Sequence, residues 1–181
     1  MEEIYDYNKL TLKRVVVIGP ESTGKSTLSA SLAKHYGTEW VPEYARKYVD
    51  RLDRDYKQSD LFEISKGQLA AELNKEQKAK RILIYDTNLL VLKIWSDYKY
   101  GNCDPEIIKK FKEKKYDLYL LTYIDVPWED DSQREHPKLR KFFYSAYKSE
   151  LEAFNLPYVE IRGEFFKRKK ESIEAIDSLV L

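Results

Sequence analysis

Residues 15–28 read VVVIGPESTGKSTL, and this stretch decides the fold of the chain. Residues 15–18 are β-branched and apolar, which suits a strand buried on both faces of a parallel sheet. Leu28, Leu32 and Ala33 then recur at helical spacing. A glycine-containing loop therefore joins a buried strand to a helix.

The loop has the spacing G-x-x-x-x-G-K-S of a phosphate-binding loop, or P-loop. Between a strand and a helix, backbone N–H groups and the helix N-terminus converge on the phosphates of a nucleotide. Gly19 and Gly24 permit the turn and the close approach of backbone to phosphate. Lys25 is expected to carry its ammonium to the outer phosphates of ATP, and the Ser26 hydroxyl to coordinate Mg²⁺. The predicted nucleotide-binding residues of the loop are Gly19, Glu21, Ser22, Thr23, Gly24, Lys25, Ser26 and Thr27, the last of which is expected to steady it.

The composition bounds the size and the partners of the protein. A chain of 181 residues, 1–181, is most simply one domain, large enough to bury a sheet with helices on both faces. Lys and Arg number 32 against 31 for Asp and Glu, which gives no electrostatic argument for binding nucleic acid or a membrane surface. The single cysteine excludes an internal disulfide, and no stretch has the apolar length of a membrane helix or signal peptide. We therefore expect a cytoplasmic protein.

Apolar runs and helical periodicity alternate along the rest of the chain. Further strands are predicted near residues 38–42, 82–87, 117–124 and 157–161, with helices between them. Strands that alternate with helices indicate a parallel sheet with right-handed crossovers. The predicted fold is a three-layer α/β sandwich around a five-stranded parallel sheet.

Polar residues follow the second predicted strand, where ligands usually bind. Glu43 and Arg46 lie one helical turn apart, shortly after Trp40, and ligands bind at the carboxyl edge of open α/β sheets. Gln68 lies on the apolar stripe of the helix predicted from residue 58 to about residue 80. Its inward-facing amide needs partners, and the sequence leaves open whether these are a ligand or the protein itself.

The strand predicted at residues 82–87 is apolar until it ends in Asp86. In P-loop proteins a carboxylate at this place usually meets the Mg²⁺ shell or the attacking hydroxyl, so Asp86 is the candidate Walker B residue. Alternatively, Asp86 caps the helix that begins near Asn88, and the two roles are compatible.

A polar stretch with two prolines and two arginines, at about residues 126–140, follows the fourth predicted strand. Small phosphotransferases need a lid that excludes water and brings arginines to the transferred phosphoryl group. We therefore predict a lid here, with Arg134 and Arg140 as catalytic arginines. The turn after the last strand is a usual place for adenine contacts, and Phe165 or Arg168 is expected to lie beside the base.

The residues around Asp86 narrow the class of P-loop protein. A GTPase normally shows D-x-x-G and N-K-x-D, whereas Asp86 is followed by TNL, and the NK pair at residues 74–75 by EQ. A motor or AAA-type ATPase usually places a glutamate directly after the Walker B aspartate to activate water, and Thr87 takes that position. A small-molecule kinase, in which one domain holds ATP, acceptor and lid, fits these residues.

The segments that belong together are GPESTGKST at 19–27, EYAR at 43–46, Gln68, YDT at 85–87, YDLYLL at 116–121, DVPWEDD at 125–131 and Arg134. They resemble the ribosylnicotinamide kinase domain of the NadR-like NAD-biosynthesis proteins, a P-loop domain of AAA-like type, from about residue 13 to the C-terminus. The resemblance implies a kinase that uses ATP and Mg²⁺ to phosphorylate the 5′-hydroxyl of nicotinamide riboside, giving nicotinamide mononucleotide.

The mechanism implied by the resemblance is in-line transfer of the γ-phosphoryl group. Asp86 or Glu43 would orient or deprotonate the ribose hydroxyl, and the sequence does not decide between them. An aromatic face and a carboxylate would suit a cationic pyridinium ring. The residues implied to hold the nucleoside are Glu43, Arg46, Gln68, Asp86 and an aromatic side chain, Trp40 or Trp128.

One departure and two alternatives bound this interpretation. The larger members of the family carry a nucleotidyltransferase domain with an H-x-G-H signature, which His35 and His136 cannot form. This chain alone is therefore not expected to make NAD from the mononucleotide or to act as a DNA-binding repressor. The alternatives are a kinase of another nucleoside or nucleotide, and a nucleotide-dependent regulatory binding protein.

Overall fold

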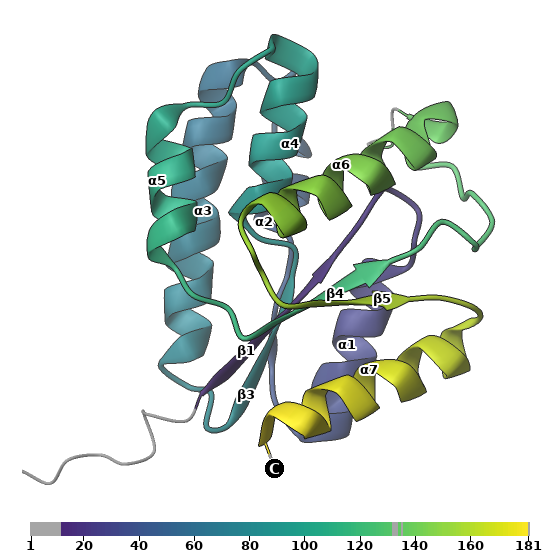
Figure 1. Cartoon of the computed structure of the whole chain (residues 1–181). Helices are drawn as coiled ribbons and strands as arrows, with labels where there is room; N and C mark the ends of the chain where they lie inside the picture. Colours follow the sequence, from purple (N-terminus) through teal and green to yellow (C-terminus); the bar gives the residue numbers. More distant parts are fainter. Residues whose placement is uncertain (1–11, 132–133, 135, 181) are drawn as a thin grey trace, which may run out of the picture.

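A parallel sheet with the strand order β2-β3-β1-β4-β5 forms the centre of the molecule (Figure 1). The computed structural model describes residues 12–131, 134 and 136–180. The strands are β1 (Lys13–Ile18), β2 (Trp40–Val41), β3 (Ile82–Asp86), β4 (Leu118–Thr122) and β5 (Tyr158–Ile161). Every pair of neighbouring strands is parallel, which confirms the predicted α/β fold with five strands.

Helices connect the strands and cover both faces of the sheet (Figure 1). They are α1 (Lys25–Tyr36), α2 (Tyr44–Val49), α3 (Gln58–Glu76), α4 (Leu89–Tyr100), α5 (Pro105–Glu113), α6 (Arg140–Ala153) and α7 (Phe165–Val180). A short 3₁₀ helix, Pro137–Leu139, leads into α6.

The alternation of side chains along β1 produces the two halves of the core. Val15 and Val17 pack with Leu28 and Leu32 of α1 and with residues of α7. Val16 and Ile18 face the opposite way, into the core formed with α3, α4, α5 and α6. All four β-branched residues of the strand are fully buried, as expected for the centre of a parallel sheet.

Two helix starts test the expectations about capping. Asn88 is the N-cap of α4, because its side chain accepts a hydrogen bond from the Leu90 N–H at 3.1 Å. The alternative in which Asp86 caps this helix is therefore wrong, and its carboxylate remains available for another role. Asp104 caps α5 in the same way, accepting from the Glu106 N–H at 2.8 Å.

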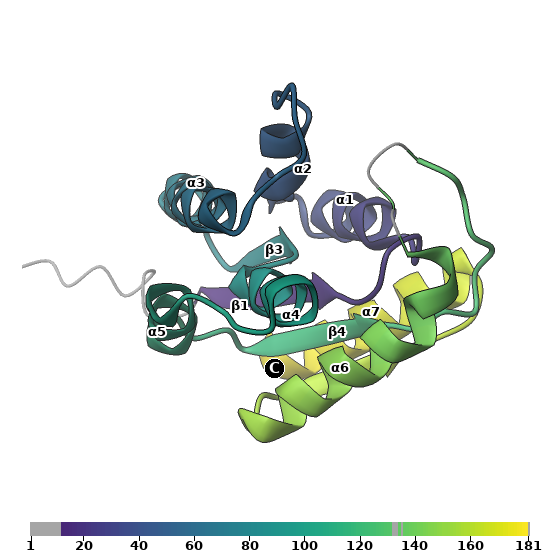
Figure 2. The same ribbon diagram turned by 90° about the horizontal axis from the view of Figure 1, so that it is seen from above.

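The carboxyl ends of the strands carry the segments that the sequence singles out. The P-loop leaves β1 there, Asp86 ends β3, and the segment between β4 and α6 projects from the body of the molecule on the side of α1 (Figure 2). Within the described part of the chain, no helix is both long and apolar enough to cross a membrane.

Candidate active site

The two glycines of the P-loop adopt backbone conformations that favour glycine. Gly19 has φ 146° and Gly24, at the N-cap of α1, has φ 76°. A Cβ atom on Gly19 would lie 2.4 Å from Thr122 Oγ1 at the end of β4. Glycine is therefore required here for packing against the neighbouring strand as well as for the turn.

Thr23 fastens the turn of the loop. Its hydroxyl donates to the Pro20 carbonyl at 2.8 Å and lies 2.7 Å from Thr122 Oγ1. The sequence analysis gives a steadying role to Thr27, but Thr27 is exposed and lines the cleft described below. The contacts that hold the loop are made by the buried Thr23.

Lys25 places its ammonium group at the base of the loop, where it donates to the Pro20 carbonyl at 2.8 Å. Burial lowers the pKa of Lys25, and the negative charges of Glu43, Asp86 and Glu21 oppose this shift. The ammonium thus lies among carboxylates beside the predicted phosphate site.

Asp86 is buried at the end of β3, with 2 % of its surface exposed, and its Oδ1 has no hydrogen-bond partner among the described residues. Burial raises the pKa of Asp86, and a hydrogen bond from the Ser26 hydroxyl and the charge of Lys25 oppose this shift. An unsatisfied carboxylate oxygen beside a hydroxyl fits a hard cation such as Mg²⁺.

Ser26 and Asp86 alone cannot complete a metal shell. No group of three or more His, Cys, Asp or Glu side chains in the described part of the chain could hold a metal ion. Mg²⁺ usually keeps several waters and binds through one or two protein ligands plus substrate phosphates. The two residues therefore fit a magnesium ion that arrives with a nucleotide.

Glu43 lies between β2 and α2, and its carboxyl group interacts with the charges of Lys25 and Asp86. It occupies the N-cap position of α2, but its side chain makes no capping hydrogen bond. Burial raises its pKa to about 7, with Asp86 adding to the shift and Lys25 opposing it. A carboxyl group that titrates near neutrality can accept a proton at physiological pH.

A cleft of about 560 Å³ opens beside the P-loop and Glu43. Its lining includes an aromatic group from the loop before α3 and from α4, α6 and α7, made of Tyr56, Trp95, Tyr98, Phe143 and Phe165. Trp95 and Tyr98 lie one turn apart on α4, the helix that directly follows Asp86. Of these aromatic residues only Phe165 was predicted from the sequence as a ligand contact; for Trp95 and Tyr98, their position on the helix that follows Asp86 was a usable signal.

The two tryptophans chosen from the sequence lie elsewhere, and neither is among the described residues that line the cleft. Trp40 is partly buried against the core on the α1 side of the sheet. Trp128 donates from its indole Nε1 to Asp130 Oδ1 at 2.8 Å. The structure therefore brings Trp95 to the cleft in place of Trp40 or Trp128.

The sequence left open whether the Gln68 amide binds a ligand or the protein. In the structure it forms hydrogen bonds with the protein itself. Its Oε1 accepts from the Tyr44 N–H at 3.0 Å, and its Nε2 donates to Glu72 Oε1 at 3.2 Å. Gln68 is 4 % exposed. Tyr44 is the first residue of α2 and follows Glu43, so the hydrogen bond from Gln68 helps to fix the backbone next to Glu43.

The predicted lid lies against the P-loop. The Glu129 N–H donates to Ser22 Oγ at 2.9 Å, and Arg134 donates to the same oxygen at 3.4 Å. Asp131 pairs with Arg46 of α2. Arg46 and Arg134 both line the cleft, as expected. Residues 132, 133 and 135 of the lid lie outside the described residues.

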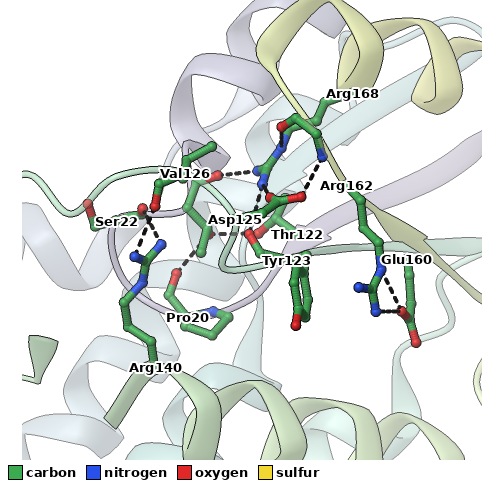
Figure 3. A network of polar contacts seen from close by, with 12 residues as sticks. Pro20, Ser22, Thr122, Tyr123, Asp125, Val126, Arg140, Glu160, Arg162 and Arg168 are labelled. Atoms are coloured by element: carbon green, nitrogen blue, oxygen red, sulfur yellow. Dashed lines mark hydrogen bonds and ion pairs between the residues drawn. The ribbon is translucent and has the colours of Figure 1, made fainter. Parts of the chain in front are cut away.

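Arg140 and Arg168 hold the backbone around the P-loop (Figure 3), and Arg168 also lines the cleft. Arg140, expected as a catalytic arginine, donates to the carbonyls of Val126 and Ser22, each at 3.0 Å. Arg168, expected beside the adenine, lies inside α7 and donates to the Thr23 carbonyl at 2.7 Å. Both guanidinium groups are therefore bonded to the backbone around the P-loop.

Comparison with known proteins places the chain in a family. The profile described as "AAA domain" matches residues 14–168. The chain belongs to this AAA-domain family. The P-loop, Asp86 and the predicted lid all lie within the matched range, so the family covers the whole candidate site.

The relatives confirm the resemblance to NadR. The chain is 27 % identical over 161 residues to the trifunctional NAD biosynthesis/regulator protein NadR of Escherichia coli, covering 84 % of this chain and 39 % of that protein. A crystal structure of NadR in complex with NR superimposes with a TM-score of 0.79 at 23 % identity, over 96 % of this chain and 53 % of that one. A second NadR structure, in complex with NAD and AMP-PNP, gives 0.76 at 23 % identity, over 96 % and 51 %.

A thymidylate kinase from Ehrlichia chaffeensis shares the same P-loop kinase fold, with a TM-score of 0.67 at 12 % identity over 92 % of this chain and 99 % of that one. At this identity the likeness concerns the fold alone. The chain spans less than half the length of the curated NadR proteins that it matches.

Proposed function

We propose that the protein is an ATP-dependent kinase that phosphorylates the 5′-hydroxyl of nicotinamide riboside to give nicotinamide mononucleotide. The observation that carries the proposal is that the Lys25 ammonium interacts with the Glu43 and Asp86 carboxylates, and that Lys25 and Glu43 line the cleft beside the P-loop. This joins a phosphate site to a proton acceptor and to a pocket for a ring. The similarity to NadR supports nicotinamide riboside as the acceptor. A cytoplasmic location is part of the proposal.

The two carboxylates have different roles, Asp86 in holding the metal ion and Glu43 in accepting a proton. Ser26 and Asp86 would hold Mg²⁺, which neutralises charge on the ATP phosphates when bound. Glu43, with its pKa raised to about 7 by burial, accepts the proton of the acceptor hydroxyl. Lys25 stabilises charge at the outer phosphates, and Arg134 approaches from the lid side of the cleft.

The aromatic group of the cleft suits the acceptor that we propose. Trp95 and Tyr98 add aromatic rings to the lining, and Asp55 adds a carboxylate, whereas the Tyr56 ring already has the Lys99 ammonium 3.6 Å from its centroid. A cationic pyridinium ring is attracted both to aromatic faces and to negative charge, whereas an uncharged base gains less from this combination. Trp95→Ala is therefore expected to raise KM for nicotinamide riboside more than KM for ATP.

The test is ADP formation from Mg·ATP with nicotinamide riboside and with a panel of ribo- and deoxyribonucleosides and nucleotides, with product masses read from the same samples. Mononucleotide from nicotinamide riboside supports the proposal. Phosphorylation of another acceptor instead would retain the kinase and reject the acceptor. No turnover across the panel would favour a nucleotide-dependent regulatory protein.

A pair of lysine variants ties any activity to the P-loop. Lys25→Ala is expected to abolish turnover, because it removes the ammonium at the phosphate site. Lys34→Ala is the matched control, since Lys34 is exposed in the last turn of the same helix. Turnover that survives Lys25→Ala would come from a contaminating enzyme or from a different site.

A further inference from the structure

Two arginines from different helices hold consecutive carbonyl groups of the P-loop (Figure 3). Arg140, at the start of α6, donates to the Ser22 carbonyl at 3.0 Å. Arg168, in α7, donates to the Thr23 carbonyl at 2.7 Å. Both bonds lie in the loop that is expected to bind phosphate through its backbone N–H groups.

A hydrogen bond to a carbonyl also fixes the direction of the N–H group in the same peptide unit. A trans peptide unit is planar, so its N–H points away from its C=O. The Ser22 carbonyl shares its unit with the Thr23 N–H, and the Thr23 carbonyl shares its unit with the Gly24 N–H. By holding the two carbonyls, the guanidinium groups fix the direction of two successive N–H donors, and successive N–H groups of this kind form anion-binding nests.

Each guanidinium is itself anchored. Arg168 is 4 % exposed and also donates to the carbonyls of Gly163, at 2.6 Å, and Tyr123, at 2.8 Å, and to the Asp125 carboxylate. Asp125 in turn accepts from the Gly163 N–H at 2.6 Å. The group is therefore fixed to the ends of β4 and β5.

Arg140 links the P-loop to a different element. Its second hydrogen bond goes to the Val126 carbonyl, at the start of the lid, at 3.0 Å. The loop is thus held from the sheet by one arginine and from the lid by the other. Ser22, whose carbonyl accepts from Arg140, has φ 55°, a conformation that a residue other than glycine rarely adopts without support.

We propose that Arg140 and Arg168 are positioning residues that hold the P-loop in the conformation that binds the phosphates of ATP, without contacting the transferred phosphoryl group or the adenine. The proposal rests on ATP being the nucleotide, as in the proposed function. It replaces the roles that the sequence suggests for both residues.

The test compares binding of two probes, Mg·ATP and inorganic tripolyphosphate with Mg²⁺, by isothermal titration calorimetry. The variants are Arg168→Met and Arg140→Met. The control is Arg162→Met, which removes the same charge from a nearby exposed side chain that pairs with Glu160 (Figure 3). Hydrogen bonds from charged groups support an expected loss of about tenfold or more in affinity for both probes with either variant, and less than about twofold with the control.

The two probes separate positioning from adenine contact. If Arg168→Met weakened ATP alone and left tripolyphosphate unchanged, Arg168 would act on the base and the proposal would be wrong. Equal losses in the Arg162→Met control would show a general charge effect and would also overturn it. A wild-type protein that binds neither probe would reject the proposed use of ATP, which is a different failure.

Kinetics and folding provide a second readout. KM for ATP is expected to rise in both variants while KM for the acceptor stays within about twofold, because neither arginine is placed at the acceptor. Arg168→Lys keeps the charge but loses the planar fork, so an intermediate affinity is expected. Should Arg168→Met fail to fold, as judged by circular dichroism, Arg140→Met and Arg168→Lys decide the question. Unchanged affinity in either of these would overturn the proposal for that residue.

Discussion

Glu43 and Asp86 show how two neighbouring carboxylates acquire different chemistry. Asp86 is bonded to Ser26 and ends a central strand, whereas Glu43 stands at the start of a short helix with no capping bond. The first is suited to a metal that arrives with phosphate, and the second to a proton.

The pH dependence of the reaction follows from the Glu43 carboxyl, whose pKa burial raises to about 7. A base works only when deprotonated, so kcat/KM for the acceptor is expected to rise with pH through about 7 and then level off. Glu43→Gln should lower kcat by about 10²-fold or more and remove this rise. Initial rates between about pH 5.5 and 8.5 measure this rise. If Glu43→Gln still showed the rise, the base would be another residue.

The same shift has a consequence for stability. The folded pKa of Glu43 lies above the ordinary value of 4.5, so its contribution to stability is present below about 4.5 and is lost as pH rises through about 7. Urea unfolding of wild type and Glu43→Gln should therefore show wild type losing stability relative to the variant over this range. A constant difference would contradict the raised pKa.

For single residues, the sequence predicted the type of site better than it predicted which side chains line that site. Lys25, Ser26 and Asp86 were predictable because the P-loop motif and the end of an apolar strand fix where they lie. Gln68 and Trp40 were not, because an amide or an indole at a given spacing has the same pattern whether it faces the cleft or the opposite side. Trp95, which lines the cleft, was not predicted for the same reason.

Between elements, the closest packing is that of α3 against α2 at Gly67. A Cβ atom there would lie 2.0 Å from the Tyr44 ring. In an exposed helix Gly→Ala stabilises by about 1 kcal/mol, but this clash reverses the sign, and overpacking costs about 1–3 kcal/mol. Gly67→Ala should therefore lower the free energy of unfolding, measured with urea. It should also reduce kcat, because Tyr44 adjoins Glu43.

Removing the ring provides the control for that change. In the double variant Tyr44→Ala/Gly67→Ala the second substitution meets open space, so its cost should disappear relative to Tyr44→Ala alone. Additive effects in this cycle would mean that the two helices are not in contact at this point.

The carboxyl half of α3 is joined to the segment between α5 and β4 by a buried carboxylate. Glu72 is fully buried, pairs with Lys114 and accepts from Tyr116 Oη at 2.9 Å. Glu72→Ala removes the acceptor of Tyr116 Oη and of Gln68 Nε2, while Lys114 keeps its ion pair with Glu76 at 3.0 Å. We expect a loss of about 3 kcal/mol in urea unfolding.

Glu63→Ala on the same helix is the matched control. Glu63 is 53 % exposed and pairs with Lys66 one turn away, and exposed pairs of this kind contribute about 0.5 kcal/mol or less. A similar cost for the two substitutions would show that the buried group adds nothing beyond a surface charge.

Element types were predictable from the sequence, and their ends were not. The strand expected at residues 38–42 is only Trp40–Val41, because it pairs with β3 alone at the edge of the sheet. The last helix begins at Phe165, which moves Arg168 from the expected turn into a helix. That shift of a few residues changed its expected partner from adenine to the P-loop backbone.

At the scale of the whole molecule, the site joins parts that are distant in sequence. The P-loop, the end of β3, the start of α2 and the lid meet only because the strand order places β1 between β3 and β4. No local sequence pattern determines this strand order. The sequence could therefore predict the separate segments of the site but not the contacts of Arg140 and Arg168 with the P-loop.

Nucleotide binding should therefore stabilise the whole fold. At a ligand concentration of 100 times Kd, binding to the folded state adds about 2.7 kcal/mol, and for a chain of 181 residues this corresponds to a rise in Tm of about 5–10 °C. Mg·ATP at saturation should give this shift in a thermal melt, and chelation of Mg²⁺ with EDTA should reduce it, because Ser26 and Asp86 then have no cation to share with the phosphates. In Asp86→Asn the shift should depend less on Mg²⁺, and in Lys25→Ala it should be small with or without the metal. A Mg²⁺ dependence that is unchanged in Asp86→Asn would place the metal on other residues.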